Sequence, residues 1–82
     1  MPGCRILYVD DDPSLRRLVE KALIRAGFDV SLATGGDEGL AMLDAGAFDA
    51  VALDHHMPGK DGLATLAAIR SRADPPPVVY VT

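Results

Sequence analysis

The stretch RILYVDDDPSLRRLVEKALIRAG, residues 5–27, decides the fold class of this chain of 82 residues. Residues 5–9 form a run with β-branched and aromatic side chains, which is typical of a buried strand. Three consecutive aspartates follow this run at once, and Pro13 begins a helical pattern. The stretch therefore predicts a strand that ends in a carboxylate cluster and leads directly into a helix.

The helix after the aspartates has a clear predicted start and end. Asp12 is predicted to cap it, because a carboxylate accepts from free backbone N–H groups and Pro13 suits the first helical position. Gly27 is typical of a helix C-terminus. The apolar residues of the helix recur at helical spacing and form one stripe: Leu15, Leu18, Val19, Ala22, Leu23 and Ala26.

The remainder of the chain continues the alternation of strand and helix. The further predicted elements are strands over residues 28–33, 50–53 and 78–81 and helices over residues 36–46 and 63–70. The resulting order, βαβαβαβ, predicts an α/β fold with a parallel sheet, right-handed crossovers and helices on both faces of the sheet.

Composition narrows the class of protein without indicating an activity. A chain of this length forms at most one small domain, so we expect residues 1–82 to be a single domain. No apolar stretch approaches the ~20 residues of a membrane span, and the single cysteine, Cys4, fits a reducing cytoplasm. The formal net charge of −4 argues against direct binding of nucleic acid by this segment.

Carboxylates and a hydroxyl follow three of the predicted strands. Asp10 and Asp11 follow the first strand, Asp54 follows the third, and Thr82 follows the fourth. Ligands of open parallel sheets collect beyond the carboxyl ends of the strands. If the first and third strands are neighbours, three carboxylates converge there, and a cation such as Mg²⁺ would offset their repulsion. A carboxylate beside Mg²⁺ can also attack phosphorus, so Asp54 stays a solvated strand end, a metal ligand or a nucleophile.

Three segments, in this order and at these separations, resemble one known family. They are ILYVDDDPSLRRLVEKALIRAGF at residues 6–28, ALDHHMPGKDGL at residues 52–63 and PPVVYVT at residues 76–82. Over its whole length the chain resembles the receiver domain of bacterial two-component response regulators. The resemblance implies a flavodoxin-like sheet with strand order 2-1-3-4-5, from which this chain would lack the last strand and two helices.

The resemblance also implies a role for each residue at the strand ends. Asp54 matches the phosphoacceptor, which takes a phosphoryl group from a sensor histidine kinase or a phosphotransfer protein. Asp11 matches the direct ligand of Mg²⁺, Asp10 matches its partner acting through water, and His56 matches the residue that gives a backbone carbonyl to the metal. Thr82 matches the switch hydroxyl that moves toward the phosphoryl group. We therefore expect a cytoplasmic switch domain that is not an enzyme, with at most weak autophosphatase activity.

One part of the family pattern has no counterpart in these residues. Receivers carry a lysine after the fifth strand that pairs with the phosphoryl group, and neither Lys21 nor Lys60 matches it. The expectation is therefore a truncated receiver, and a second function stays open: an interaction module that cannot be phosphorylated. An unpaired edge on the fourth strand and an uncovered apolar face predict self-association as a dimer.

Two other kinds of chemistry fit the residues less well. A phosphatase of the haloacid-dehalogenase type would use the spacing of Asp10 and Asp12, with Ser14 near its hydroxyl position. That fold needs more chain and a catalytic lysine, and it leaves the frame around Asp54 unexplained. A transition-metal site at the histidine pair, residues 55–56, is disfavoured because neighbouring side chains of an extended chain point to opposite sides.

Overall fold

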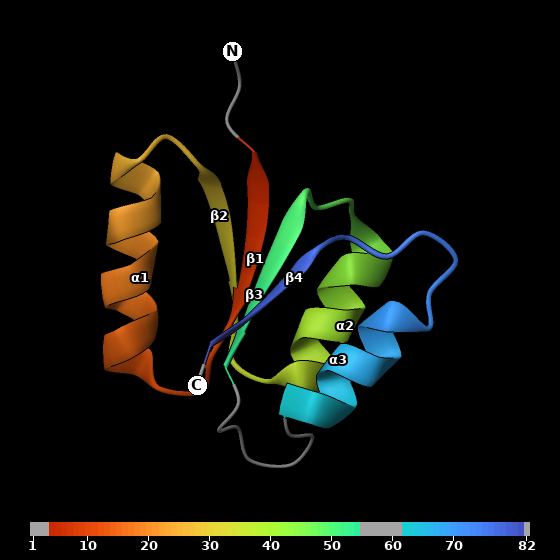
Figure 1. The fold of residues 1–82 in the computed structure, drawn as a ribbon. Coiled ribbons are helices and arrows are strands. Elements are labelled where there is room, and N and C mark those ends of the chain that lie inside the picture. Colours follow the sequence, from red (N-terminus) through yellow and green to blue (C-terminus); the bar gives the residue numbers. More distant parts are fainter. Residues whose placement is uncertain (1–3, 55–61, 82) are drawn as a thin grey trace.

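The helices and strands follow the order predicted from the sequence (Figure 1). The computed structural model describes residues 4–54 and 62–81. Its elements are β1 (Arg5–Val9), α1 (Pro13–Arg25), β2 (Asp29–Ala33), α2 (Gly36–Ala45), β3 (Ala50–Asp54), α3 (Gly62–Arg70) and β4 (Val78–Val81). Their bounds differ from the predicted ones by one residue at most. For example, β2 begins after Phe28, because the Phe28 N–H still donates to the Leu23 carbonyl at the end of α1, at 3.0 Å.

The four strands form one parallel sheet in the order β2-β1-β3-β4. This order confirms the flavodoxin-like arrangement expected for the first four strands, with β1 and β3 as neighbours. Val9 pairs with Leu53, and Asp54 pairs with Val81. The carboxyl ends of β1, β3 and β4 therefore lie beside one another. The strand order reverses at β1, and open parallel sheets bind ligands at such a reversal, beyond the carboxyl ends of the strands.

The helices lie on both faces of the sheet, as predicted. In Figure 1, α1 covers one face, whereas α2 and α3 lie together on the other. The core lies between the sheet and the α2–α3 pair, and its buried members are Leu7, Val9, Ala33, Leu43, Val51, Leu53 and Ile69. None of the helices in residues 4–54 and 62–81 is both long and apolar enough to cross a membrane.

The two ends of α1 are built as the sequence predicts. The Asp12 carboxylate accepts from the N–H groups of Ser14, at 2.9 Å, and Leu15, at 3.2 Å. At the other end Gly27 has φ 97°, a left-handed conformation that side chains with a Cβ rarely adopt. Asp12 is therefore the N-cap of α1, and Gly27 allows the chain to turn back into β2.

The apolar stripe of α1 is covered less than its pattern indicates. No residue of α1 is buried, and Leu18 is 65% exposed. The reason is the position of the helix, which packs on β2 and β1. On the same sheet face, Val79 of β4 is 59% exposed. Leu18 of α1 and Val79 of β4 are therefore exposed apolar side chains on the same side of the sheet.

Candidate functional site

The predicted site lies at the edge of the sheet where β1, β3 and β4 end. Asp10 follows Val9 of β1, and Asp54 follows the residue of β3 that pairs with Val9, so the two aspartates occupy adjacent positions on neighbouring strands. Val81, opposite Asp54, ends β4. Figure 1 shows the three ends of the strands at one edge of the molecule. Three of the predicted groups lie outside the described part of the chain: the side chain of Asp54, and the residues His56 and Thr82.

Among the described residues of this edge, Asp10 is the most firmly held. It is fully buried, and its Oδ2 atom accepts from the Tyr8 hydroxyl at 2.6 Å, while Oδ1 accepts from the Asp12 N–H at 3.0 Å. Its backbone is held as well, because the Asp10 N–H donates to the Ala33 carbonyl at 3.1 Å and Nη1 of Arg16 donates to the Asp10 carbonyl at 2.9 Å. A buried carboxylate without such partners would be costly, and these contacts explain how the fold tolerates it.

The three consecutive aspartates have three different surroundings. Asp10 is buried and hydrogen-bonded, and Asp12 is exposed and caps α1. Asp11 between them is half-buried, and no hydrogen bond from another described residue reaches its carboxylate. Among the described residues, nothing therefore competes for the carboxylate of Asp11. Asp12 has a structural task, which removes one of the two carboxylates that the phosphatase hypothesis requires.

The oxygen atoms at this edge fit a magnesium ion that keeps several of its waters. Each carboxylate oxygen has two lone pairs, so Asp10 retains acceptor capacity for a water after its two protein hydrogen bonds. Asp11 offers a hard anionic ligand, and the Arg16 guanidinium brings a positive charge to the acidic cluster. Residues 4–54 and 62–81 contain no cluster of three acidic, histidine or cysteine side chains that would hold a metal by itself. The predicted set is completed by groups outside them.

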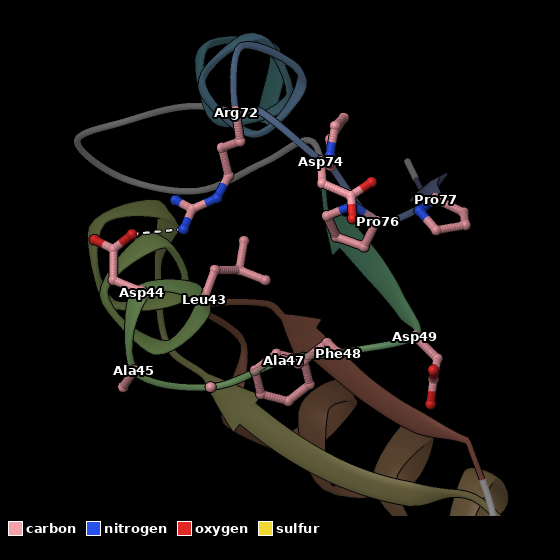
Figure 2. A pocket seen from close by; sticks show the side chains of 12 residues that line it. Leu43, Asp44, Ala45, Ala47, Phe48, Asp49, Arg72, Asp74, Pro76 and Pro77 are labelled. Carbon is pink, nitrogen blue, oxygen red and sulfur yellow. Dashed lines mark hydrogen bonds and ion pairs between the residues drawn. The ribbon is translucent and has the colours of Figure 1, made fainter.

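A separate pocket lies at the opposite edge of the sheet, where β3 and β4 begin (Figure 2). It measures about 610 Å³ and is lined by the end of α2, the loop into β3 and the proline-rich loop into β4. Nη2 of Arg72 contacts Oδ1 of Asp44 at 2.6 Å across its wall, and Oδ2 of Asp49 accepts from the Arg5 N–H at 2.7 Å. Because none of the predicted site residues lines it, this pocket is distinct from the candidate site.

The sequence pattern did not single out Tyr8 and Arg16 as residues of this edge. The sequence indicates only that Tyr8 belongs to a strand, two positions before Asp10. Alternate residues of a strand share a face, so strand alternation alone indicates that the two side chains point to the same side. The contact of Arg16 with the Asp10 carbonyl needs the orientation of α1 on the sheet, and no local pattern encodes that.

The class of protein follows from this geometry: a flavodoxin-like α/β domain with acidic residues at the carboxyl ends of adjacent parallel strands. The model of the response regulator receiver domain family matches residues 6–82. The chain belongs to this family, which is one of two-component signalling, and the resemblance found in the sequence is confirmed.

Individual relatives agree with this assignment. The transcriptional regulatory protein TcrA of Mycobacterium tuberculosis is 38% identical over 80 residues, which cover 98% of this chain and 32% of that protein. The response regulator TrrA of Thermotoga maritima, solved in complex with Mg²⁺-BeF, is 38% identical with a TM-score of 0.83, over 85% of this chain and 61% of that one. The solved complex of the histidine kinase ThkA with TrrA matches at 35% identity and a TM-score of 0.90, over 96% of this chain and 68% of that one. The chain thus spans about a third of the length of the first curated relative.

Proposed function

We propose that this chain is the phosphoacceptor of a two-component phosphorelay, with Asp54 as the residue that receives the phosphoryl group. The observation that carries the proposal is the register of the sheet, because Asp54 ends β3 beside Asp10 at the end of β1. The family assignment supports it, and the solved complex of a histidine kinase with a response regulator supports a sensor histidine kinase as the donor. A phosphotransfer protein that presents a phosphohistidine would serve equally.

The proposed chemistry is the transfer of a phosphoryl group from a histidine nitrogen of the donor to a carboxylate oxygen of this chain. A carboxylate oxygen of Asp54 attacks the phosphorus atom of the phosphohistidine, the P–N bond breaks, and its electron pair stays on the imidazole nitrogen. The product is an acyl phosphate on Asp54. The chain itself turns over no substrate, so it acts as a cytoplasmic switch, with at most weak autophosphatase activity when water attacks the acyl phosphate.

The proposed metal is Mg²⁺, which would neutralise charge on the phosphoryl oxygens. Asp11 and Asp54 would bind it directly together with the backbone carbonyl of His56, and Asp10 would bind it through a water. The half-buried and uncommitted carboxylate of Asp11 beside the fixed carboxylate of Asp10 supports this division. The Thr82 hydroxyl would donate to a phosphoryl oxygen. The solved relative TrrA in complex with Mg²⁺-BeF supports the choice of metal.

Intact-mass spectrometry after incubation with Mg²⁺ and acetyl phosphate tests this function. The unmodified chain is expected to gain one phosphoryl group, and Asp54→Asn is expected to gain none. Asp37→Asn is the matched control, because Asp37 is an exposed carboxylate in the first turn of α2. An adduct that persists in Asp54→Asn would contradict the assignment. So would an unlabelled chain under conditions that label a complete receiver.

The second candidate function is self-association without phosphorylation. It is favoured by two exposed apolar side chains on one side of the sheet, Leu18 of α1 at 65% and Val79 of β4 at 59%. It is also favoured by β4 itself, an edge strand of the described sheet that contains no charged residue. Edge strands without charges invite pairing with another chain. Sedimentation velocity over a range of concentrations tests this candidate: a dimer is expected, and a monomer at every concentration would refute it.

A further inference from the structure

We propose that Tyr8 is a positioning residue for the magnesium site, and that its hydroxyl holds the Asp10 carboxylate where it accepts from a metal-bound water. The inference rests on the proposed function, because it concerns the metal of the phosphoacceptor site. It assigns a task to a tyrosine that neither the sequence pattern nor the proposed transfer uses.

The contact between Tyr8 and Asp10 is short and excluded from water. The two residues alternate along β1 and its extension, and so share one face of the sheet. Tyr8 is 2% exposed, Asp10 is fully buried, and the hydroxyl donates to Oδ2 at 2.6 Å. Hydrogen bonds to an ionised group are stronger than neutral ones, and a low local dielectric strengthens them further. The hydroxyl is therefore a strong constraint on this carboxylate.

A second donor makes the constraint specific to one orientation. The Asp12 N–H donates to Oδ1 of Asp10 at 3.0 Å, so one carboxylate oxygen is held by a residue of β1 and the other by the turn after it. Rotation of the carboxylate would break at least one of these bonds. With both bonds in place, Asp10 cannot turn to compete with Asp11 for the metal, and its remaining lone pairs keep a fixed direction.

A fixed acceptor matters because of the geometry that magnesium requires. Mg²⁺ demands near-ideal octahedral coordination and usually keeps several waters, so the groups that bind these waters set how well the ion fits. Asp11 accepts no hydrogen bond from the described residues, whereas Asp10 accepts two. The rigid partner in this pair is Asp10, and Tyr8 is the side chain that keeps it rigid. Loss of a partner outside the ligand shell typically weakens metal affinity 10–100-fold.

The Tyr8→Phe variant separates this role from simple packing. It keeps the ring in its buried space and removes only the hydroxyl. The control is Ile69→Val, which trims a buried side chain in the core between the sheet and the α2–α3 pair, away from the ends of the strands. Urea unfolding of both variants verifies that they are destabilised to a similar degree, so that any difference in metal binding is not an effect of stability.

The measurement is calorimetric titration of Mg²⁺ into the whole chain. Tyr8→Phe is expected to bind Mg²⁺ about tenfold more weakly than the unmodified chain, and Ile69→Val is expected to bind it as the unmodified chain does. A double-mutant cycle with Asp10→Ala supplies a readout that a packing role would not move. Once the carboxylate is gone, adding Tyr8→Phe is expected to change the affinity no further. Should Asp10→Ala fail to fold, the Mg²⁺ affinities of Tyr8→Phe and Ile69→Val are sufficient to test the role of Tyr8.

Three results would overturn the inference: unchanged affinity in Tyr8→Phe, an equal loss in Ile69→Val, or a tenfold loss that persists in the Asp10→Ala background. They leave the proposed function intact, because the unmodified chain binds Mg²⁺ in each of them. If the unmodified chain binds no Mg²⁺, the proposed metal site fails and the role of Tyr8 fails with it. The two failures are therefore distinguishable in one set of titrations.

Discussion

Removal of the Asp12 carboxylate is expected to weaken α1 and to leave the metal site intact. Asp12 is the third of three adjacent acids, and the phosphatase hypothesis would place it in the site. In the structure its Oδ1 atom accepts from the N–H groups of Ser14, at 2.9 Å, and Leu15, at 3.2 Å. Asp12→Ala removes both hydrogen bonds and the negative charge at the helix N-terminus. Asp12→Ser keeps an oxygen acceptor at the same position and removes the charge.

The magnitude follows from the two contributions of this cap. Replacing a capping side chain by alanine costs about 1 kcal/mol, within a range of roughly 0.5–2 kcal/mol. Losing an exposed negative charge at the start of a helix costs a further ~0.3–1 kcal/mol. Asp12→Ala should therefore lower the free energy of unfolding by about 1–2 kcal/mol, and Asp12→Ser by about 0.5 kcal/mol. For a domain of this size each kcal/mol corresponds to a fall in Tm of roughly 4–8 °C.

Two assays on the same variants test this reasoning. Urea unfolding followed by far-UV circular dichroism gives the free energy of unfolding, and calorimetric titration gives the Mg²⁺ affinity. We expect the order unmodified, Asp12→Ser, Asp12→Ala in stability, with the Mg²⁺ affinity of Asp12→Ser unchanged. A loss of Mg²⁺ binding in Asp12→Ser, or no loss of stability in Asp12→Ala, would refute the assignment of Asp12 as a cap.

Two further substitutions test the packing of α2 on β1 and the role of an exposed leucine of α1 in self-association. Gly39→Ala is expected to lower the free energy of unfolding in urea by about 1 kcal/mol, because the new Cβ would lie 3.0 Å from Cγ2 of the buried Val9. Overpacking costs about 1–3 kcal/mol, which exceeds the ~1 kcal/mol gained in helix propensity. A Val9→Ala background should abolish this loss of stability, and a loss that remains there would show that Val9 is not its cause. Leu18→Lys should change stability by less than about 0.5 kcal/mol, because the side chain is 65% exposed, and should shift sedimentation toward the monomer. Leu63→Lys, at a residue of α3 that is 58% exposed, is its control, and an equal shift in both variants would count against a specific role of Leu18 in self-association.

The unit formed by β1 and α1 could be predicted from the sequence almost completely. A strand of apolar residues, a cap at Asp12 and a C-terminal Gly27 are local features, because each depends on side chains within a few residues of one another along the chain. The structure has all three where the pattern indicates them. The strand order is different in kind, since pairing joins segments that are distant in sequence. It was expected from the resemblance to the receiver family, and the residues themselves left it open.

The contacts that hold the site are the part that local patterns do not reveal. A glycine within a helix such as Gly39 indicates by itself only a lower helix propensity. The structure gives it a packing reason, since a Cβ at this position of α2 would lie 3.0 Å from Cγ2 of Val9 in β1. The apolar stripe of α1 was a correct pattern, yet it does not specify how much of the stripe the sheet covers. Both facts depend on distances between elements, and a single sequence carries no direct record of those distances.

The turn after β1 joins the stability of α1 to the placement of the acidic groups. The Asp12 N–H donates to the Asp10 carboxylate while the Asp12 carboxylate caps α1, so one residue serves the site with its backbone and the helix with its side chain. Arg16, one turn into α1, donates to the Asp10 carbonyl from the other direction. Tyr8 completes the arrangement from within β1. Donors from the strand, the turn and the helix thus converge on Asp10, and the contact from Arg16 depends on the packing of α1 on the sheet. The part of the candidate site that surrounds Asp10 is therefore held in place by contacts within β1, the turn and α1.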